Sequence, residues 1–91
     1  MSRYTIYLTK QAFKDLEEIK RLKIPSLSWR VEWVTKLLQK DPMMRCPSFK
    51  KLTGDFEGLL ARKLSHCRLL IYQVLEEKKA IKIVRMLKDQ A

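Results

Sequence analysis

Hydrophobic and polar residues alternate along the first part of the chain, from Arg3 to Thr9, in a run rich in Tyr, Thr and Ile. Alternation over so short a run is typical of a β-strand with one buried face. We expect Tyr4, Ile6 and Leu8 to share that face. The hydroxyl of Thr9 can accept a hydrogen bond from the first turn of a following helix, so a helix is predicted to start there.

Hydrophobic residues then recur every three or four positions, which predicts a helix from Lys10 to about Lys23. We expect Ala12, Leu16, Ile19 and Leu22 to recur along its inner side, with Phe13 beside them. Charged residues occupy the opposite face. Pro25 is expected to end this helix, because proline cannot donate a backbone hydrogen bond.

A second helix is predicted to run to about Lys40, with Ser26 or Ser28 as its cap. It carries two hydrophobic stripes, the first formed by Leu27, Val31, Val34 and Leu38 and the second by Trp29, Trp33 and Leu37. So wide a hydrophobic surface favours contact with both the first helix and a sheet. The tryptophans are candidate platforms for stacking nucleic-acid bases, but their helical spacing favours core packing, which is our prediction.

The remainder of the chain predicts strands. Asp41-Pro42 ends the second helix, because proline disfavours a helical conformation in the preceding residue. Residues 43–48 show no period, and Gly54 and Gly58 bracket a turn. The three strands expected after it are Leu59 to Ser65, Arg68 to Leu75 and Ala80 to Leu87. The order β-α-α-β-β-β indicates an α+β domain, with two helices packed on one face of a twisted, antiparallel-rich sheet.

Size and composition favour a single soluble domain over residues 1–91. No hydrophobic run approaches the ~18 residues that a membrane-spanning helix needs, and the polar start does not resemble a signal peptide. We therefore expect a cytoplasmic protein with no membrane partner. Cys46 and Cys67 fit no metal or redox spacing, and we interpret them as reduced thiols.

Charge is the most informative part of the composition. The chain has 20 Lys and Arg against 10 Asp and Glu, a net charge of +10. Such an excess destabilises a compact state through self-repulsion, so an acidic or polyanionic partner is expected. RNA, DNA, a ribosomal surface and an acidic protein all remain open on charge alone.

An ordered set of motifs resembles the RelE/ParE toxin superfamily of toxin–antitoxin systems, with the Txe/YoeB toxins as the most similar branch. The motifs are Asp41-Pro42, PSFKKLTGD at 47–55, Gly58, ARKL at 61–64, LIYQVL at 70–75 and IVRM at 83–86. The resemblance covers nearly the whole chain and implies a RelE-like fold. It also implies a ribosome-dependent mRNA endonuclease, held inactive in a hetero-oligomer by a cognate acidic antitoxin.

In that branch the ribose 2′-hydroxyl attacks the adjacent phosphate without a metal or cofactor, so none is expected here. The chemistry requires a base, an acid and positive charge at the phosphorane. This sequence departs from the branch at the positions that supply them. The glutamate base falls on Lys50, the histidine–arginine pair on Arg68 and Leu69, and the final histidine and tyrosine on Asp89 and Gln90.

Two interpretations of these departures remain open. In the first, cations replace the acid–base pair: Arg68 and Arg85 stabilise the phosphorane, and Lys50 or Lys63 transfers the proton. A lysine crowded by other cations has a lowered pKa, which suits that task. The further RNA-binding candidates are Lys51, Arg62, His66, Tyr72 and Lys88. Tyr72 would orient or stack a base, although a strand tyrosine is more often a core residue.

In the second interpretation the protein is a catalytically inactive homologue that binds an antitoxin or RNA without cleaving. A third possibility, a ParE-like inhibitor of DNA gyrase, shares the scaffold. The clustering of cations after Cys46 favours RNA over that target.

Overall fold

The computed structural model describes residues 4–41, 49–51, 59–65 and 68–88. Its elements are β1 (Thr5–Leu8), α1 (Lys10–Arg21), α2 (Pro25–Lys40), β2 (Phe49–Lys51), β3 (Leu60–Ser65), β4 (Arg68–Leu75), a 3-10 turn (Glu76–Lys78) and β5 (Ala80–Lys88). The expectations for the connector at 43–48, the Gly54–Gly58 turn, both cysteines, His66, Asp89 and Gln90 lie outside the described residues.

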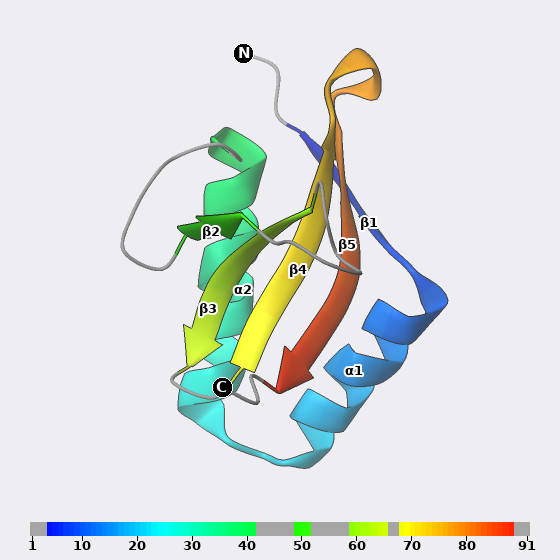
Figure 1. Ribbon diagram of the computed structural model, residues 1–91. Helices are drawn as coiled ribbons and strands as arrows, with labels where there is room; N and C mark the ends of the chain where they lie inside the picture. The colour runs from blue at the N-terminus through cyan, green and yellow to red at the C-terminus, as the bar shows by residue number, and fades with distance from the viewer. Residues whose placement is uncertain (1–3, 42–48, 52–58, 66–67, 89–91) are drawn as a thin grey trace.

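The strands form one five-stranded sheet in the order β1-β5-β4-β3-β2. The first strand pairs in parallel with the last, and the other neighbours are antiparallel. Figure 1 shows α2 behind the sheet and α1 alongside β5. The predicted α+β architecture is confirmed. The strand β2 was not predicted, because three residues are too few to show a period.

Thr9 begins α1 as expected, since its hydroxyl accepts a hydrogen bond from the amide of Ala12 at 3.0 Å. The same hydroxyl donates to the carbonyl of Val84 at 2.8 Å. Because β1 ends at Leu8, these contacts continue the edge pairing of β5 beyond the parallel strand. The helix ends at Arg21, two residues before the predicted end, and Lys23 takes a left-handed φ of 52° in the turn that follows.

The prediction that Ser26 or Ser28 caps the second helix is wrong. Pro25 is already its first helical residue, and Ile24 is the cap residue, without a side-chain hydrogen bond. Proline suits that position because its missing N–H would have had no partner in the first turn. Pro25 therefore starts α2 rather than only ending α1.

The core lies between the sheet and the two helices. It contains Ala12 and Ile19 from α1, Leu27, Val31, Val34 and Leu38 from α2, and Leu60, Leu64, Leu70, Tyr72, Ile81, Ile83 and Met86 from the strands. The first predicted stripe of α2 is thus confirmed as core. None of the helices in the described ranges is long and apolar enough to cross a membrane.

The second stripe of α2 is different, and the prediction that its tryptophans are core residues is wrong. Trp29 is 60% exposed and Trp33 is 41% exposed. Trp29 stands two residues from both Leu27 and Val31, which is about 200° around a helix axis. Burying those two residues therefore turns Trp29 outwards. One side of α2 meets the sheet, and the tryptophans lie on the other.

Candidate functional site

Strand alternation divides the predicted cations between the two faces of the sheet, because successive side chains point to opposite faces. Arg62 lies between the core residues Leu60 and Leu64, and it is only 2% exposed. Arg68 lies two residues before the core residue Leu70 and is 7% exposed. Both arginines therefore belong to the helix-covered face.

Tyr72 also belongs to the helix-covered face. It has no exposed surface and forms part of the core cluster. A ring enclosed in this way cannot stack on a base, and a buried guanidinium cannot reach a phosphate. The RNA-binding or catalytic roles of Arg62, Arg68 and Tyr72 stay predictions, and they require this layer to open.

Two other predicted site residues lie in one backbone row that runs across the sheet. Lys50 of β2 pairs with Ala61, Ala61 with Ile71, and Ile71 with Arg85 of β5. The row crosses four strands, so the backbones of Lys50 and Arg85 are about 14 Å apart, at ~4.8 Å per strand. Two proposed catalytic residues thus occupy the ends of one row.

Lys63 lies in the next row, where it pairs with Leu69 and is partly exposed. We call the side of the sheet that carries Lys63, Ile71 and Arg85 the open face. Its two cations are partly exposed, whereas Ala61 and Ile71 between them are buried, at 0% and 2% exposure. Of the remaining candidates, Lys51 pairs with Leu60 and Lys88 pairs with Arg68, while His66 lies outside the described residues. Among the residues that are described, no three His, Cys, Asp or Glu gather as a metal site would require.

Arg85 is held by a carboxylate from α1. Its Nε donates to Asp15 Oδ2 at 2.8 Å and its Nη2 donates to Oδ1 at 3.3 Å. Asp15 Oδ2 also accepts the backbone N–H of Met86 at 3.0 Å. The carboxylate therefore accepts a hydrogen bond from the edge of β5 at a position beyond the end of its pairing with β1.

The contacts between Asp15 and Arg85 favour the charged form of both side chains. Burial acts to raise the pKa of Asp15, but the hydrogen bonds from Arg85 and Met86 outweigh it and the pKa is lowered. The Asp15 hydrogen bond raises the pKa of Arg85. Arg85 is thus a charged but already partnered cation, and a phosphate on the open face would compete with Asp15 for it.

A hollow of about 420 Å³ adds residues that the sequence analysis missed. It is lined by Tyr7, Leu8, Thr9, Leu75, Lys78 and Lys82. Lys82 pairs with both Gln73 and Tyr7, which places all three in a further row of the open face. The sequence contained a signal for Lys82. It lies between the core residues Ile81 and Ile83 in a strand, so its side chain must point to the face opposite theirs.

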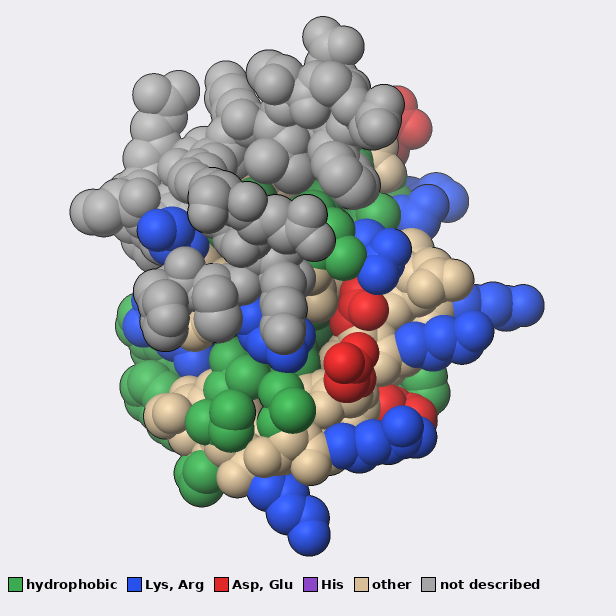
Figure 2. Space-filling view, turned by 60° about the horizontal axis from the view of Figure 1, so that its bottom comes forward, with side chains coloured by type: hydrophobic (Ala, Val, Ile, Leu, Met, Phe, Trp, Pro, Cys, Tyr) green, Lys and Arg blue, Asp and Glu red, His purple; other side chains and the backbone are tan. Residues whose placement is uncertain are grey.

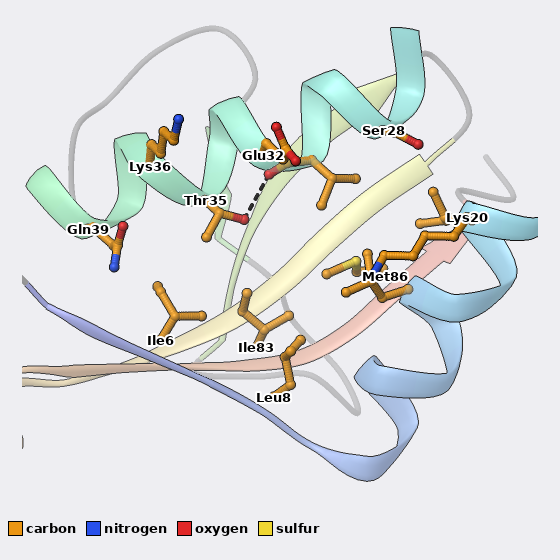
Figure 3. A pocket seen from close by; sticks show the side chains of 13 residues that line it. Ile6, Leu8, Lys20, Ser28, Glu32, Thr35, Lys36, Gln39, Ile83 and Met86 are labelled. Carbon is orange, nitrogen blue, oxygen red and sulfur yellow. Dashed lines mark hydrogen bonds between the residues drawn. The ribbon is translucent and has the colours of Figure 1, made fainter. Parts of the chain in front are cut away.

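A larger pocket of about 520 Å³ lies on the helix-covered side, between α1, α2 and the strands β1 and β5. Figure 3 shows Ile6, Leu8 and Ile83 at its sheet side, with Lys36 and Gln39 on the α2 side and Lys20 on α1. Its lining is mainly hydrophobic. Such a pocket suits an apolar segment better than a phosphate group.

The comparisons with known proteins identify a shared fold. No protein-family model matches the chain, and no curated protein matches its sequence. A YoeB/ParE toxin from Agrobacterium tumefaciens is similar in structure, with a TM-score of 0.81 at 14% identity, over 92% of this chain and 96% of that one.

Two solved complexes are similar as well. The YoeB-YefM complex from Staphylococcus aureus gives a TM-score of 0.75 at 21% identity, over 93% of this chain and 95% of the other. The toxin–antitoxin complex RelBE2 from Mycobacterium tuberculosis gives 0.70 at 22% identity, over 94% and 98%. The chain therefore has the fold of the YoeB, ParE and RelE toxins, which confirms the fold that the motifs implied.

Proposed function

We propose that this protein is the toxin of a toxin–antitoxin system and that it cleaves mRNA on the ribosome. The observation that carries the proposal is the cation-bearing open face of a sheet with the fold of YoeB and ParE toxins. Lys63, Lys82 and Arg85 come from different positions along β3 and β5 and share this face. A net charge of +10 supports a polyanion as the ligand.

In the proposed reaction the ribose 2′-hydroxyl attacks the neighbouring phosphate and the 5′-oxygen of the next nucleotide leaves, giving a 2′,3′-cyclic phosphate. Lys50 or Lys63, in its neutral form, accepts the hydroxyl proton, and the leaving 5′-oxygen takes a proton from water. Arg85 stabilises the phosphorane once a phosphate oxygen replaces an Asp15 oxygen at its guanidinium. The mechanism uses no metal or cofactor.

The proposed partner in the resting cell is an acidic antitoxin bound in a hetero-oligomer. The similar structures include two toxin–antitoxin complexes, which supports this assignment. An acidic partner would also relieve the self-repulsion of a +10 chain. Action on the ribosome would place the protein in the cytoplasm.

The test is an in vitro translation reaction with primer extension on the message. We expect cuts that require both ribosomes and this protein, and about 10²-fold slower cutting by Lys63→Ala if Lys63 is the proton-transfer group. Lys14→Ala is the matched control, because Lys14 is an exposed lysine on α1. An intact message, under conditions where a YoeB toxin cuts, would refute the catalytic proposal.

A second candidate is an inactive homologue that binds an antitoxin or RNA without cleaving. It is favoured by the partnered state of Arg85 and the burial of Arg68, which leave fewer available cations for catalysis. This candidate predicts no growth arrest on expression and co-purification with an acidic protein or RNA. Growth arrest that Lys63→Ala relieves would exclude it.

A further inference from the structure

The outward side of α2 carries an ordered aromatic stack. The rings of Trp29 and Trp33 are parallel within 8°, with centroids 5.9 Å apart. The guanidinium carbon of Arg30 lies 4.8 Å from the Trp33 ring centroid, at cation–π distance. The stack is therefore present without a ligand, and its residues Trp29 and Trp33 are 60% and 41% exposed.

Exposed aromatic surface of this extent favours binding of a ligand, since burial of both rings would lower the free energy. In the described part of the chain, the buried Nε of Arg30 also has no hydrogen-bond partner. This nitrogen belongs to the guanidinium that lies over the Trp33 ring, so both features occur at one place on α2. Figure 2 shows hydrophobic side chains gathered with Lys and Arg beside them, toward the end of the molecule where α2 begins in Figure 1.

Charge decides what kind of ligand fits. A second copy of this chain would bring +10 against +10, which disfavours self-association through this surface. Lys36 and Lys40 are exposed further along α2 and, with Arg30, outnumber its one acidic residue, Glu32. Flat aromatic rings beside cations match unpaired nucleotides, whose bases stack and whose phosphates pair with Lys and Arg.

We propose that Trp29, Arg30 and Trp33 form a second binding surface for single-stranded RNA, on the helix layer. An unpaired base extends the stack on Trp29, and Arg30 and the α2 lysines hold the backbone. All three residues belong to α2, which lies behind the sheet in Figure 1, and none of them is an open-face residue. It therefore does not depend on cleavage, and RNA can bind here whether or not the message is cut.

The two tryptophans are the only ones in the protein, so intrinsic fluorescence reports on this surface alone. The experiment titrates the full chain with a labelled 12-nucleotide oligouridylate and follows both tryptophan emission and RNA anisotropy. We expect saturable quenching that follows the anisotropy curve. Trp29→Ala should weaken binding by about 5- to 150-fold, the range that corresponds to the loss of one stacked base.

The control variant is Phe13→Ala, which removes an aromatic residue of 52% exposure from α1 and should leave the affinity unchanged. Trp29→Phe keeps a ring and should retain most of the affinity. Because Trp29 is largely exposed, circular dichroism should show the fold intact in each variant.

Three results would overturn the proposal: unquenched emission at saturating RNA, an unchanged midpoint of the Trp33 quenching curve in Trp29→Ala, or equal quenching by polyglutamate, which would indicate an acidic protein as the ligand. Failure here is distinguishable from failure of the proposed function. Cleavage in the translation assay is read on the message, and Lys63→Ala should leave the RNA-induced quenching in place.

Discussion

The same strands place cations on both faces of the sheet, but the solvent exposure of these cations differs between the faces. Arg62 and Lys63 are adjacent in β3, yet the first is 2% exposed and the second is accessible. On the helix-covered face a cation is part of the packing. On the open face it is available to a ligand, or held at the edge as Arg85 is by Asp15. Successive side chains of a strand point to opposite faces, so about half of the basic residues in such a run lie on any one face.

This difference between the faces separates stability from binding. Substitutions on the helix-covered face should change the free energy of unfolding, and substitutions on the open face should change RNA affinity. The clearest test uses neighbouring residues of one strand, which differ in face but hardly in position.

Tyr72→Ala should have the largest effect. The side chain is fully buried in the core, so its loss leaves a cavity and should cost about 3–5 kcal/mol of unfolding free energy. Gln73→Ala, one residue along β4 and on the open face, should change it by less than about 0.5 kcal/mol. Urea denaturation of both variants provides the measurement. Equal losses would contradict the assignment of faces.

Asp15→Asn should cost about 1–2 kcal/mol, less than a fully buried ion pair, because the Arg85 side chain is one-third exposed. The amide can still accept the Met86 N–H but no longer pairs with the charge of Arg85. Thermal or urea unfolding at pH 7 measures the loss. Glu17→Gln, an exposed carboxylate on the same helix, is the control and should be nearly neutral.

The Asp15 contribution should also depend on pH. Its pKa is lowered in the folded state, so the stabilisation is complete above the unfolded pKa of about 3.9 and is lost as pH falls through the folded pKa. The stability difference between the wild type and Asp15→Asn should therefore be constant from about pH 5 to 7 and shrink below about pH 4. A difference that persists at pH 2 would assign the effect to packing instead.

Lys63→Ala should act on binding and leave stability nearly unchanged. Removing one cation that pairs with a phosphate should flatten the slope of log affinity against log salt by about 0.7 for single-stranded RNA. A wild-type protein that neutralises about five phosphates would give a slope near −3.5. Lys14→Ala again serves as the control. An unchanged slope in Lys63→Ala would remove this residue from the RNA-binding surface.

Glu76→Gln should have the smallest effect. Glu76 accepts hydrogen bonds from the Tyr4 hydroxyl at 3.0 and 3.1 Å and lies 3.6 Å from the Lys79 amine. These side chains are mostly exposed, so we expect a loss below about 1 kcal/mol, decreasing as salt is added. A loss as large as that of Asp15→Asn would show that the edge contact of Asp15 is no more important than a surface pair.

The sequence predicted the elements that have a clear period. The strand from Arg68 to Leu75 matches β4, and the stripe of Leu27, Val31, Val34 and Leu38 is the buried side of α2. The motifs led to the RelE-like fold. These features depend on local alternation and on side-chain type, which a sequence displays directly.

The features that were missed depend on partners far along the chain. Trp29 looks like core by composition, and only the packing of Leu27 and Val31 against the sheet turns it outwards. The link between Asp15 and Arg85 joins residues 70 positions apart and has no local signature. The backbone row from Lys50 to Arg85 requires the register of three strand pairs. Register follows from the assembled sheet rather than from any one segment.

The parallel pairing of β1 with β5 has a consequence for biosynthesis. Thr9 finds its partner Val84 only across 75 residues, so the first strand has no place in the sheet until the last strand has been made. Pairings this distant in the chain also slow folding, because a large loop must close before they form. A ribosome that stalls before Ala80 therefore carries a nascent chain without its completed sheet.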